Sequence, residues 1–342
     1  MATMNSVAVT FEHILVPTDF SEVSQRALEY AKTIARQGNS ELLLVHVNPP
    51  INLLTPPEAA WIDESEIQSQ REEQLEQSGA ALRSEGFRAQ AISLTGPLYD
   101  ELLSAIKQYK VDLIVMGTHG KKGLQRLLIG SDAEAMLRQA RCPVLSVGPA
   151  VPALQDKMWR IREVICATTL HPHSAEVAAF AHKVAAQHGA ELVLFHVKNP
   201  DSEEDADWVS FGEAFHQHVS EDLGKISSLR TRLASAAPGV SIVDFAKQRG
   251  SDLIVMGARP ASSMATHLPQ GAAAKVLVEA PCPVMTLLQG KFLGASLRRQ
   301  AAAQETSIEP LRQSQDLRGV GTRFESQVPR VMVFQDGFYD YR

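Results

Sequence analysis

The first 150 residues alternate short apolar runs with longer segments whose apolar side chains recur at helical spacing. Residues 13–16 form an apolar, β-branched run that Pro17 ends, and residues 41–47 form a second run. Between the two, Ser21 can cap a helix that extends to about Arg36 and that Gly38 ends. The apolar stripe of this helix consists of Val23, Ala27, Tyr30, Ala31 and Ile34. The pattern predicts a strand, a helix and a second strand.

The alternation continues to residue 147. It predicts helices over 64–85, 98–109 and 131–139, and strands over 89–94, 111–116 and 144–147. Apart from Asp112, the predicted strands carry no internal charge, which indicates a parallel sheet covered by helices on both faces. We therefore expect an α/β fold, a flavodoxin-like or Rossmann-like doubly wound domain with five mainly parallel strands. In such sheets ligands bind beyond the carboxyl ends of the strands, and residues 17–20, 47–50 and 116–120 belong to that edge.

The chain contains this pattern twice. Residues 14–47 align without a gap with residues 164–197, and ten of the 34 aligned positions are identical. Residues 111–147 align in the same way with residues 251–287, with 13 identities in 37 positions. Internal similarity of this kind indicates a duplicated domain.

The second copy is shorter than the first. The alignment offset falls from 150 to 140 between the two aligned blocks, so about ten residues are missing from the middle of the second copy. The gap is expected opposite residues 89–100, which include the predicted strand 89–94. The sequence therefore allows a second sheet that is one strand short.

The repeat divides the chain into three parts. We expect a first domain over residues 11–150, a second domain over residues 160–289, and a largely disordered C-terminal tail over residues 290–342. A chain of 342 residues that is 44% hydrophobic and 21% charged can bury two cores of about 150 residues each. Composition thus agrees with two compact domains.

Composition and charge exclude several classes of protein. No apolar stretch approaches the roughly 18 residues of a membrane span, and the N-terminus lacks the pattern of a secretory signal, so we expect a cytoplasmic protein with no membrane partner. The net charge of −6 argues against a nucleic-acid partner. Cys142, Cys166 and Cys282 lack the CxxC spacing of metal or redox sites. They are typical of small buried apolar residues.

A glycine pattern follows the predicted strand at 111–116. Gly117, Gly120, Gly130 and Ser131 stand at the spacing G-x2-G-x9-G-S. The first two glycines let the backbone turn tightly and approach a ligand. The last two positions open a helix whose unpaired N–H groups favour an anion, and Lys121, Lys122 and Arg126 lie between them. The pattern predicts a phosphate-binding loop; the alternative is a glycine hinge with solvated lysines.

On these residues the chain resembles the universal stress protein family, over nearly all of residues 11–288 as two tandem domains. The family's ATP-binding branch carries the motif G-x2-G-x9-G-[S/T], an aspartate after the first strand, matched by Asp19, and backbone near the end of the second strand, matched by Val47. The resemblance implies ATP, with or without Mg²⁺ or Mn²⁺, across the first domain. The site residues implied are Pro17, Thr18, Asp19, Val47, Met116, Gly117, His119, Gly120, Lys121, Lys122, Arg126, Gly130, Ser131 and Asp132. For Asp19 the alternative is a cap on the helix that begins near Ser21.

The second copy departs from the motif at its polar positions. Thr169 replaces Asp19, Ala167 replaces Pro17, Pro260 replaces Gly120 and Gln270 replaces Gly130. Proline removes a backbone donor and glutamine adds bulk where the backbone should approach the ligand. We expect no tight nucleotide binding by the second domain.

The resemblance also implies a mode of assembly. Domains of this family commonly pair through their last strands, which here are residues 144–147 and 285–288. We expect the two domains to pair within one chain as a pseudo-dimer, and two chains can assemble further as a homodimer.

Histidines offer a rival site. His171, His173 and His196 fall near the ligand edge of the second sheet, with His216 and His218 in the next segment. Three imidazoles can hold zinc. However, His196 has a counterpart in His46, which favours a buried histidine common to both repeats. We expect no metal site.

Three functions stay open on the sequence. The first is an ATP-binding stress-response regulator whose nucleotide lies in the first domain and whose protein partner is unknown. The second is an enzyme that slowly hydrolyses ATP or transfers its phosphate, although no P-loop motif occurs and Asp19 and Asp132 are the only acidic candidates at this edge. The third is a nucleotide-free interaction module. We favour binding without efficient turnover and assign no catalytic residue.

Overall fold

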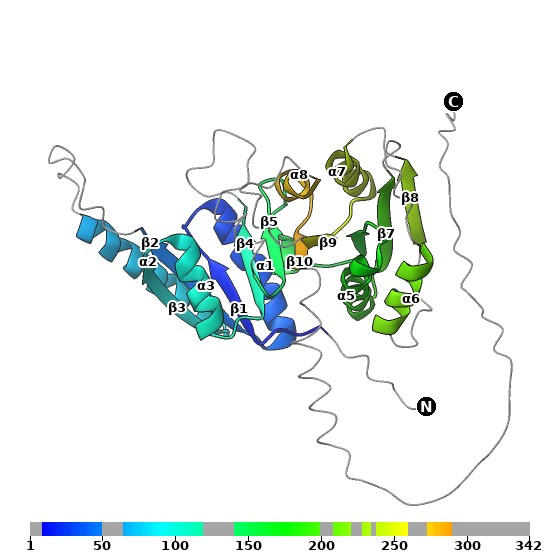
Figure 1. The fold of residues 1–342 in the computed structure, drawn as a ribbon. Helices are drawn as coiled ribbons and strands as arrows, with labels where there is room; N and C mark the ends of the chain where they lie inside the picture. Colours follow the sequence, from blue (N-terminus) through cyan, green and yellow to red (C-terminus); the bar gives the residue numbers. More distant parts are fainter. Residues whose placement is uncertain are drawn as a thin grey trace, which may run out of the picture.

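The computed structural model describes residues 9–49, 64–118, 140–198, 208–219, 228–233, 237–258 and 272–288. Within these residues, ten strands form one sheet in the order β3-β2-β1-β4-β5-β10-β9-β6-β7-β8 (Figure 1). The strands of the first domain are β1 (His13–Pro17), β2 (Glu41–Asn48), β3 (Arg88–Thr95), β4 (Leu113–Gly117) and β5 (Val144–Val147). Those of the second are β6 (Glu163–Ala167), β7 (Glu191–Lys198), β8 (Ser228–Leu233), β9 (Leu253–Ala258) and β10 (Val284–Leu288). Each domain repeats the same order, so the predicted doubly wound α/β fold is confirmed.

Helices cover both faces of the sheet (Figure 1). One face, called the α1 face below, packs against α1 (Glu22–Gly38), α2 (Glu64–Ser84), α5 (Pro172–His188) and α6 (Trp208–His218). The other, called the α3 face, packs against α3 (Leu98–Gln108), α7 (Pro238–Arg249) and α8 (Ala272–Glu279). None of the helices in the described part of the chain is long and apolar enough to cross a membrane.

Helix α1 begins as predicted and ends one residue later than expected. The Oγ of Ser21 accepts a hydrogen bond from the backbone N–H of Ser24 at 3.2 Å, which makes Ser21 the N-cap. Gly38 is still helical, and Asn39 adopts the left-handed conformation that ends the helix (φ 51°). Asparagine tolerates this conformation better than other non-glycine residues. The stop signal was therefore at Asn39, beside the glycine.

The expectation of a missing strand in the second sheet is wrong. Strand β8 pairs in parallel with β7, and Val193 faces Ser228 there as its counterpart Leu43 faces Gln90. Strand β8 thus occupies the place of β3. The shortening precedes it, because 39 residues separate β2 from β3 and 29 separate β7 from β8, a difference of ten. A deletion in the segment between two strands shortens the domain without opening a gap in the strand ladder.

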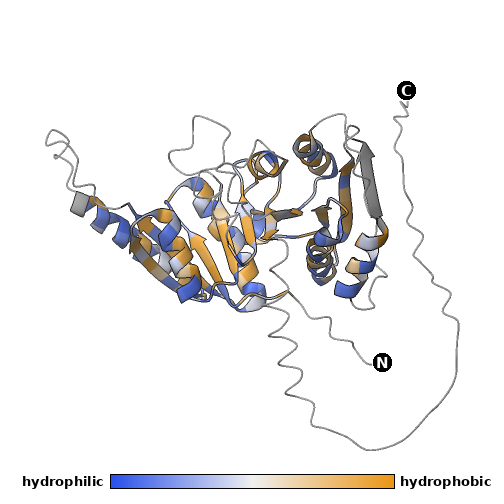
Figure 2. Ribbon diagram, viewed as in Figure 1, coloured by the Kyte–Doolittle hydropathy of each residue, from blue (hydrophilic) through white to orange (hydrophobic). Residues whose placement is uncertain are grey.

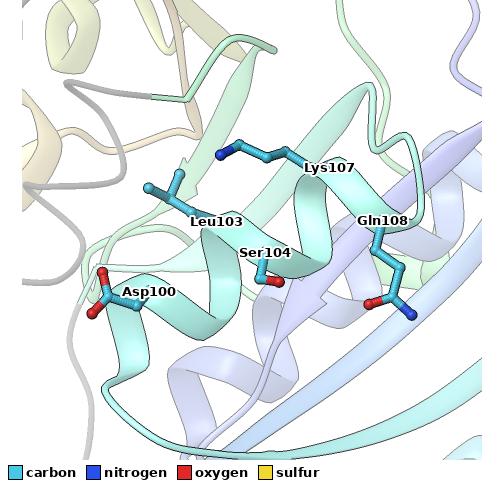
Figure 3. Close-up of a pocket in the computed structure, with 5 residues that line it drawn as sticks. All are labelled: Asp100, Leu103, Ser104, Lys107 and Gln108. Atoms are coloured by element: carbon cyan, nitrogen blue, oxygen red, sulfur yellow. The ribbon is translucent and has the colours of Figure 1, made fainter.

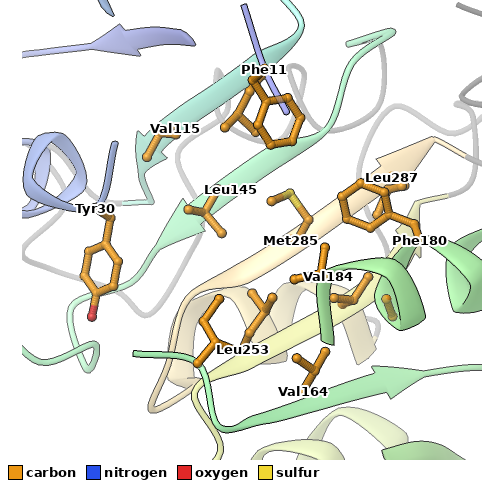
Figure 4. Close-up of a cluster of buried hydrophobic side chains, with 14 of the residues drawn as sticks. Phe11, Tyr30, Val115, Leu145, Val164, Phe180, Val184, Leu253, Met285 and Leu287 are labelled. Carbon is orange, nitrogen blue, oxygen red and sulfur yellow. The ribbon is translucent and has the colours of Figure 1, made fainter. Parts of the chain in front are cut away.

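The two domains join edge to edge through their last strands, as expected for a pseudo-dimer. Strands β5 and β10 pair antiparallel, with Leu145 opposite Met285, and Thr286 Oγ1 donates to the carbonyl oxygen of Val144 at 3.2 Å. Figure 4 shows Phe11 and Leu145 of the first domain beside Met285 and Phe180 of the second. These four buried side chains belong to one apolar cluster. The strands carry most of the apolar colouring in Figure 2, and the core on the α1 face is continuous across the domain boundary.

The segment that connects the domains is tied to both of them. Arg26 Nη1 donates to the carbonyl oxygens of Pro149 and Val151 at 3.1 and 2.6 Å. The indole N–H of Trp159 donates to the carbonyl oxygen of Asp252 at 3.3 Å, and its ring lies edge to face with Tyr30 at 5.2 Å. Helix α1 of the first domain and the amino edge of the second sheet are thereby linked.

The helix predicted over residues 131–139 lies outside the described residues, and so does the tail predicted over residues 290–342. The domain limits 11–150 and 160–289 stay predictions.

Candidate functional site

The strand order of the first domain reverses between β1 and β4. From β1 the chain proceeds outward to β2 and β3, and it returns on the other side of β1 as β4 and β5. Leu15 of β1 pairs with Ile114 of β4, so Pro17 and Gly117 end their strands side by side at the carboxyl edge. Ligands of doubly wound sheets bind at such a reversal point. The structure thus brings together the two segments in which sequence analysis placed Pro17, Thr18, Asp19, Met116 and Gly117.

A short turn after β1 carries Thr18 and Asp19 at this edge. The backbone N–H of Thr18 donates to the carbonyl oxygen of Val45 at 2.8 Å, and Thr18 Oγ1 accepts from the backbone N–H of Phe20 at 3.1 Å. Phe20 has φ 60°, in the left-handed region. For a bulky residue this conformation costs about 1–3 kcal/mol and persists only where neighbouring contacts hold it. The turn is therefore a fixed feature of the edge.

Asp19 does not cap helix α1 directly. Its Oδ1 accepts a hydrogen bond at 3.0 Å from the backbone N–H of Ser21, the residue that is itself the N-cap. The carboxylate thus stabilises the turn that leads into the helix, a structural role close to the one considered from the sequence. The two roles considered from the sequence are compatible, because a carboxylate can accept several hydrogen bonds. The role in ligand binding stays a prediction.

His46 anchors the turn from the neighbouring strand. Its Nδ1 lies 2.7 Å from the carbonyl oxygen of Thr18, and its ring lies 4.8 Å from the ring of Phe20. A carbonyl oxygen only accepts hydrogen bonds, so Nδ1 carries the proton and donates it. The sequence interpretation of His46 as a buried histidine is confirmed, since 8% of it is exposed. Its bond to the turn could not be inferred from the strand pattern.

The α3 face forms an apolar wall beneath this edge. Met116 is buried, and Val47 packs against the same cluster. Leu94 and Tyr99, which sequence analysis did not select, pack there too, at the end of β3 and the start of α3. Burial, with a smaller contribution from the charge of Asp100, raises the pKa of the Tyr99 hydroxyl. A wall of this kind suits the flat face of an aromatic base.

Gly117 has a packing role that its motif did not indicate. A Cβ built on it would lie 3.0 Å from Cγ1 of Val23 and 3.3 Å from the backbone nitrogen of Ser24. The missing side chain thus makes room for the start of α1, and the predicted approach of a ligand stays a prediction. Close packing of a helix on a strand is a separate reason for glycine in such motifs.

The phosphate half of the predicted site lies outside the described residues, which end at Thr118 in this segment. Its members are His119, Gly120, Lys121, Lys122, Arg126, Gly130, Ser131 and Asp132. Their roles stay predictions. Thr118 itself is buried, and its backbone N–H donates to the carbonyl oxygen of Val147 at 3.1 Å.

A shallow hollow of about 500 Å³ follows helix α3 (Figure 3). It is lined by Asp100, Leu103, Ser104, Lys107 and Gln108, all from one side of this single helix. None of these is a predicted site residue. The hollow is open and mixed in polarity, so we assign it no ligand.

The second domain repeats the turn after β6. Leu170 has φ 57°, Thr168 Oγ1 accepts from its backbone N–H at 3.0 Å, and Nδ1 of His196 lies 2.9 Å from the carbonyl oxygen of Thr168. The backbone and its anchors are therefore the same in both domains. The difference lies in the side chains, because Thr169 stands where the first domain has Asp19. Pro260 and Gln270 lie outside the described residues.

The histidines of the second domain do not assemble a metal site within the described residues. His171 is the N-cap residue of α5 and His173 lies in its first turn, while His196 is bonded to the turn after β6. No group of three His, Cys, Asp or Glu side chains in the described ranges is placed to hold an ion. The cysteines are buried as expected, and burial raises the pKa of Cys142 and of Cys166 to about 12.

Fold and topology together define a tandem α/β protein whose first sheet reverses its strand order between β1 and β4. The chain matches the universal stress protein family over residues 10–148 and again over residues 160–287. It belongs to that family, as the resemblance indicated, with two domains in tandem.

Relatives of this chain match either part of it or most of it. The universal stress protein MJ0531 of Methanocaldococcus jannaschii is 36% identical over 141 residues, which are 40% of this chain and 82% of that protein. A universal stress protein of Mycolicibacterium smegmatis is 25% identical over 300 residues, or 80% of this chain and 96% of that protein. The crystal structure of a universal stress protein from Archaeoglobus fulgidus covers 81% of this chain and 98% of its own, with a TM-score of 0.61 and 23% identity. This last likeness supports the fold.

Proposed function

We propose that this protein is a stress-response regulator that binds one ATP per chain, in the first domain. The observation that carries the proposal is the convergence of Asp19, Met116 and Gly117 at the reversal point of the first sheet. The apolar wall with Val47 supports a base there, and the carboxylate of Asp19 supports a ribose hydroxyl group as its partner.

The motif beyond Gly117 supplies the remaining half of the proposal. Backbone N–H groups at the start of a helix and the cations Lys121, Lys122 and Arg126 suit the phosphates of ATP, with or without Mg²⁺ or Mn²⁺. The chain offers no recognised catalytic set, so the proposed role is binding. Occupancy of the first domain would then be the signal passed to a protein partner.

Equilibrium titration of the full chain with ATP tests the proposal. We expect one ATP per chain, loss of binding in Gly130→Gln, and unchanged binding in the matched variant Gln270→Ala. Asp19→Asn keeps an oxygen for the N–H of Ser21 and removes the charge, so we expect about tenfold weaker binding. Two ATP per chain, or full binding by Gly130→Gln, would contradict the proposal. ADP and AMP as competitors define the preferred nucleotide.

Turnover separates a binder from an enzyme. We expect no ATP hydrolysis above the uncatalysed rate with either Mg²⁺ or Mn²⁺ present. Hydrolysis that is lost in Gly130→Gln would instead favour the ATPase alternative.

A further inference from the structure

His46 connects two strands of the first domain at the proposed nucleotide edge without belonging to the binding wall. It lies on the α1 face of β2, whereas the next residue, Val47, packs on the α3 face. Its donor nitrogen lies 2.7 Å from the carbonyl oxygen of Thr18, and the ring is almost fully buried. The imidazole therefore contacts the turn after β1 from the α1 face of the sheet, opposite to the apolar wall.

The turn that His46 holds is the one that carries Asp19. Thr18 precedes Asp19, and its carbonyl oxygen accepts a hydrogen bond from the imidazole of His46. Phe20 follows Asp19, and its ring lies against the same imidazole. Phe20 has a left-handed backbone that surrounding contacts must maintain. The peptide unit before Asp19 is thus held by the hydrogen bond from His46, while the N–H of the peptide unit after it donates to the hydroxyl of Thr18 and the Phe20 ring lies against the imidazole.

We infer that His46 is a positioning residue for the nucleotide site and acts through Asp19. Its hydrogen bond to Thr18 keeps the carboxylate at the carboxyl edge of β1, where the ribose is proposed to bind. The inference rests on the proposed function. His46 is not a binding residue itself, because its ring faces the α1 side of the sheet.

The second domain provides a matched control for this inference. His196 makes the equivalent hydrogen bond to the carbonyl oxygen of Thr168 at 2.9 Å, and Leu170 has a left-handed backbone like that of Phe20. However, Thr169 stands where the first domain has the carboxylate. A histidine that only stabilises the fold would behave alike in both domains. A positioning residue would differ, because only the first turn carries the carboxylate.

The experiment compares His46→Leu, His46→Asn and His196→Leu in the full chain, by ATP titration and urea unfolding. Leucine fills the volume without a donor, so we expect about tenfold weaker ATP binding by His46→Leu. The amide nitrogen of asparagine can occupy the place of Nδ1, so we expect His46→Asn to bind within about threefold of the unchanged protein. His196→Leu should lose as much stability as His46→Leu and bind ATP as before.

A double-mutant cycle tests the route through Asp19. The variant His46→Leu/Asp19→Asn should bind ATP no more weakly than Asp19→Asn alone, because the carboxylate that His46 positions is already gone. Additive losses would overturn the inference. If His46→Leu fails to fold, His46→Gln replaces it, since its amide reaches the place of Nε2 and not that of Nδ1.

Two further outcomes are distinguishable. Wild-type affinity in His46→Leu, with one ATP per chain in the unchanged protein, overturns the inference and leaves the proposed function standing. No ATP binding by the unchanged protein overturns the proposed function, and the inference fails with it.

Discussion

The turns after β1 and β6 share one backbone but not one chemistry. Each has a left-handed residue, Phe20 or Leu170, and each is anchored by a threonine and by a histidine from the next strand. Only the first carries a carboxylate. The comparison teaches that the strained turn belongs to the fold, because it persists in the domain whose motif is broken. The chemical difference between the two turns lies in the side chains they carry, Asp19 in the first and Thr169 in the second.

The two domains also differ in the contacts that hold their first helix to the helix that follows it. Helix α1 buries Lys32, which pairs with Glu29 and Glu85 at 2.9 and 2.7 Å. At the equivalent position α5 buries His182, whose ring lies edge to face with Phe215 at 6.3 Å. Ionic contacts thus tie α1 to the end of α2, whereas an aromatic contact ties α5 to α6.

The prediction with the largest expected effect tests whether the two domains unfold independently of each other. Leu145 is fully buried at the domain boundary and belongs to the cluster that spans it. Leu145→Ala should lower the free energy of unfolding by about 3 kcal/mol, through lost burial and a residual cavity. Because the core is continuous, both domains should unfold in one shifted transition, measured by urea titration with fluorescence and circular dichroism.

The control is Val209→Ala, at a side chain that is 73% exposed, which should change stability by less than about 0.5 kcal/mol. Two separate transitions in Leu145→Ala, with only one of them shifted, would mean that the domains fold independently.

An effect of intermediate size concerns the ends of α3 and α7. Lys110 and its counterpart Gly250 both have left-handed backbones, with φ 52° and 65°. This conformation costs an ordinary L-residue roughly 1 kcal/mol and glycine little. Gly250→Lys should therefore destabilise the protein by about 1 kcal/mol, and Lys110→Gly should stabilise it by a similar or smaller amount. Thermal unfolding of both exchanges measures the pair, and changes of equal sign would refute the explanation.

The smallest effect depends on pH. The hydrogen bond from Lys32 holds the pKa of Glu85 below its usual range, against the opposing effect of burial. A carboxylate whose pKa is lowered by folding stabilises the protein above its unfolded-state pKa, and the contribution disappears as pH falls through the lowered value. Glu85→Gln should cost about 0.5 kcal/mol at pH 7, because the carboxylate is partly exposed and water screens the pair.

Below the lowered pKa of Glu85, the variant and the unchanged protein should be equally stable. Urea unfolding at pH 7 and at several acidic values checks this, and a difference that does not depend on pH would rule out the ionic explanation.

Much of this fold follows from the sequence, for identifiable reasons. The apolar runs predicted the strands, Ser21 predicted the start of α1, and the two aligned blocks predicted the duplication. The pairing of β5 with β10 was implied by the family resemblance. Strand β8 was missed because the lost residues were assigned to a strand, while an alignment cannot tell which element absorbs a deletion. The packing of Gly117 against Val23 could not be predicted from the sequence, because a glycine near a ligand and a glycine under a helix look alike in a sequence.

The candidate site was predictable only in part. Pro17, Asp19, Met116 and Gly117 meet at one edge because the carboxyl ends of parallel strands always do. The bond from His46 to Thr18 joins residues 28 positions apart and depends on how β2 pairs with β1. The pattern of hydrophobic residues along the sequence cannot predict a contact of that kind.

The antiparallel pairing of β5 with β10 has a consequence for how this protein evolves. An assembly of two identical chains carries every substitution twice, so both copies of a site are lost or kept together. Here the equivalent strands belong to one polypeptide. The shared core can then be conserved while the edge of one domain is released from selection for a ligand, and the asymmetry between the domains is inherited with the gene.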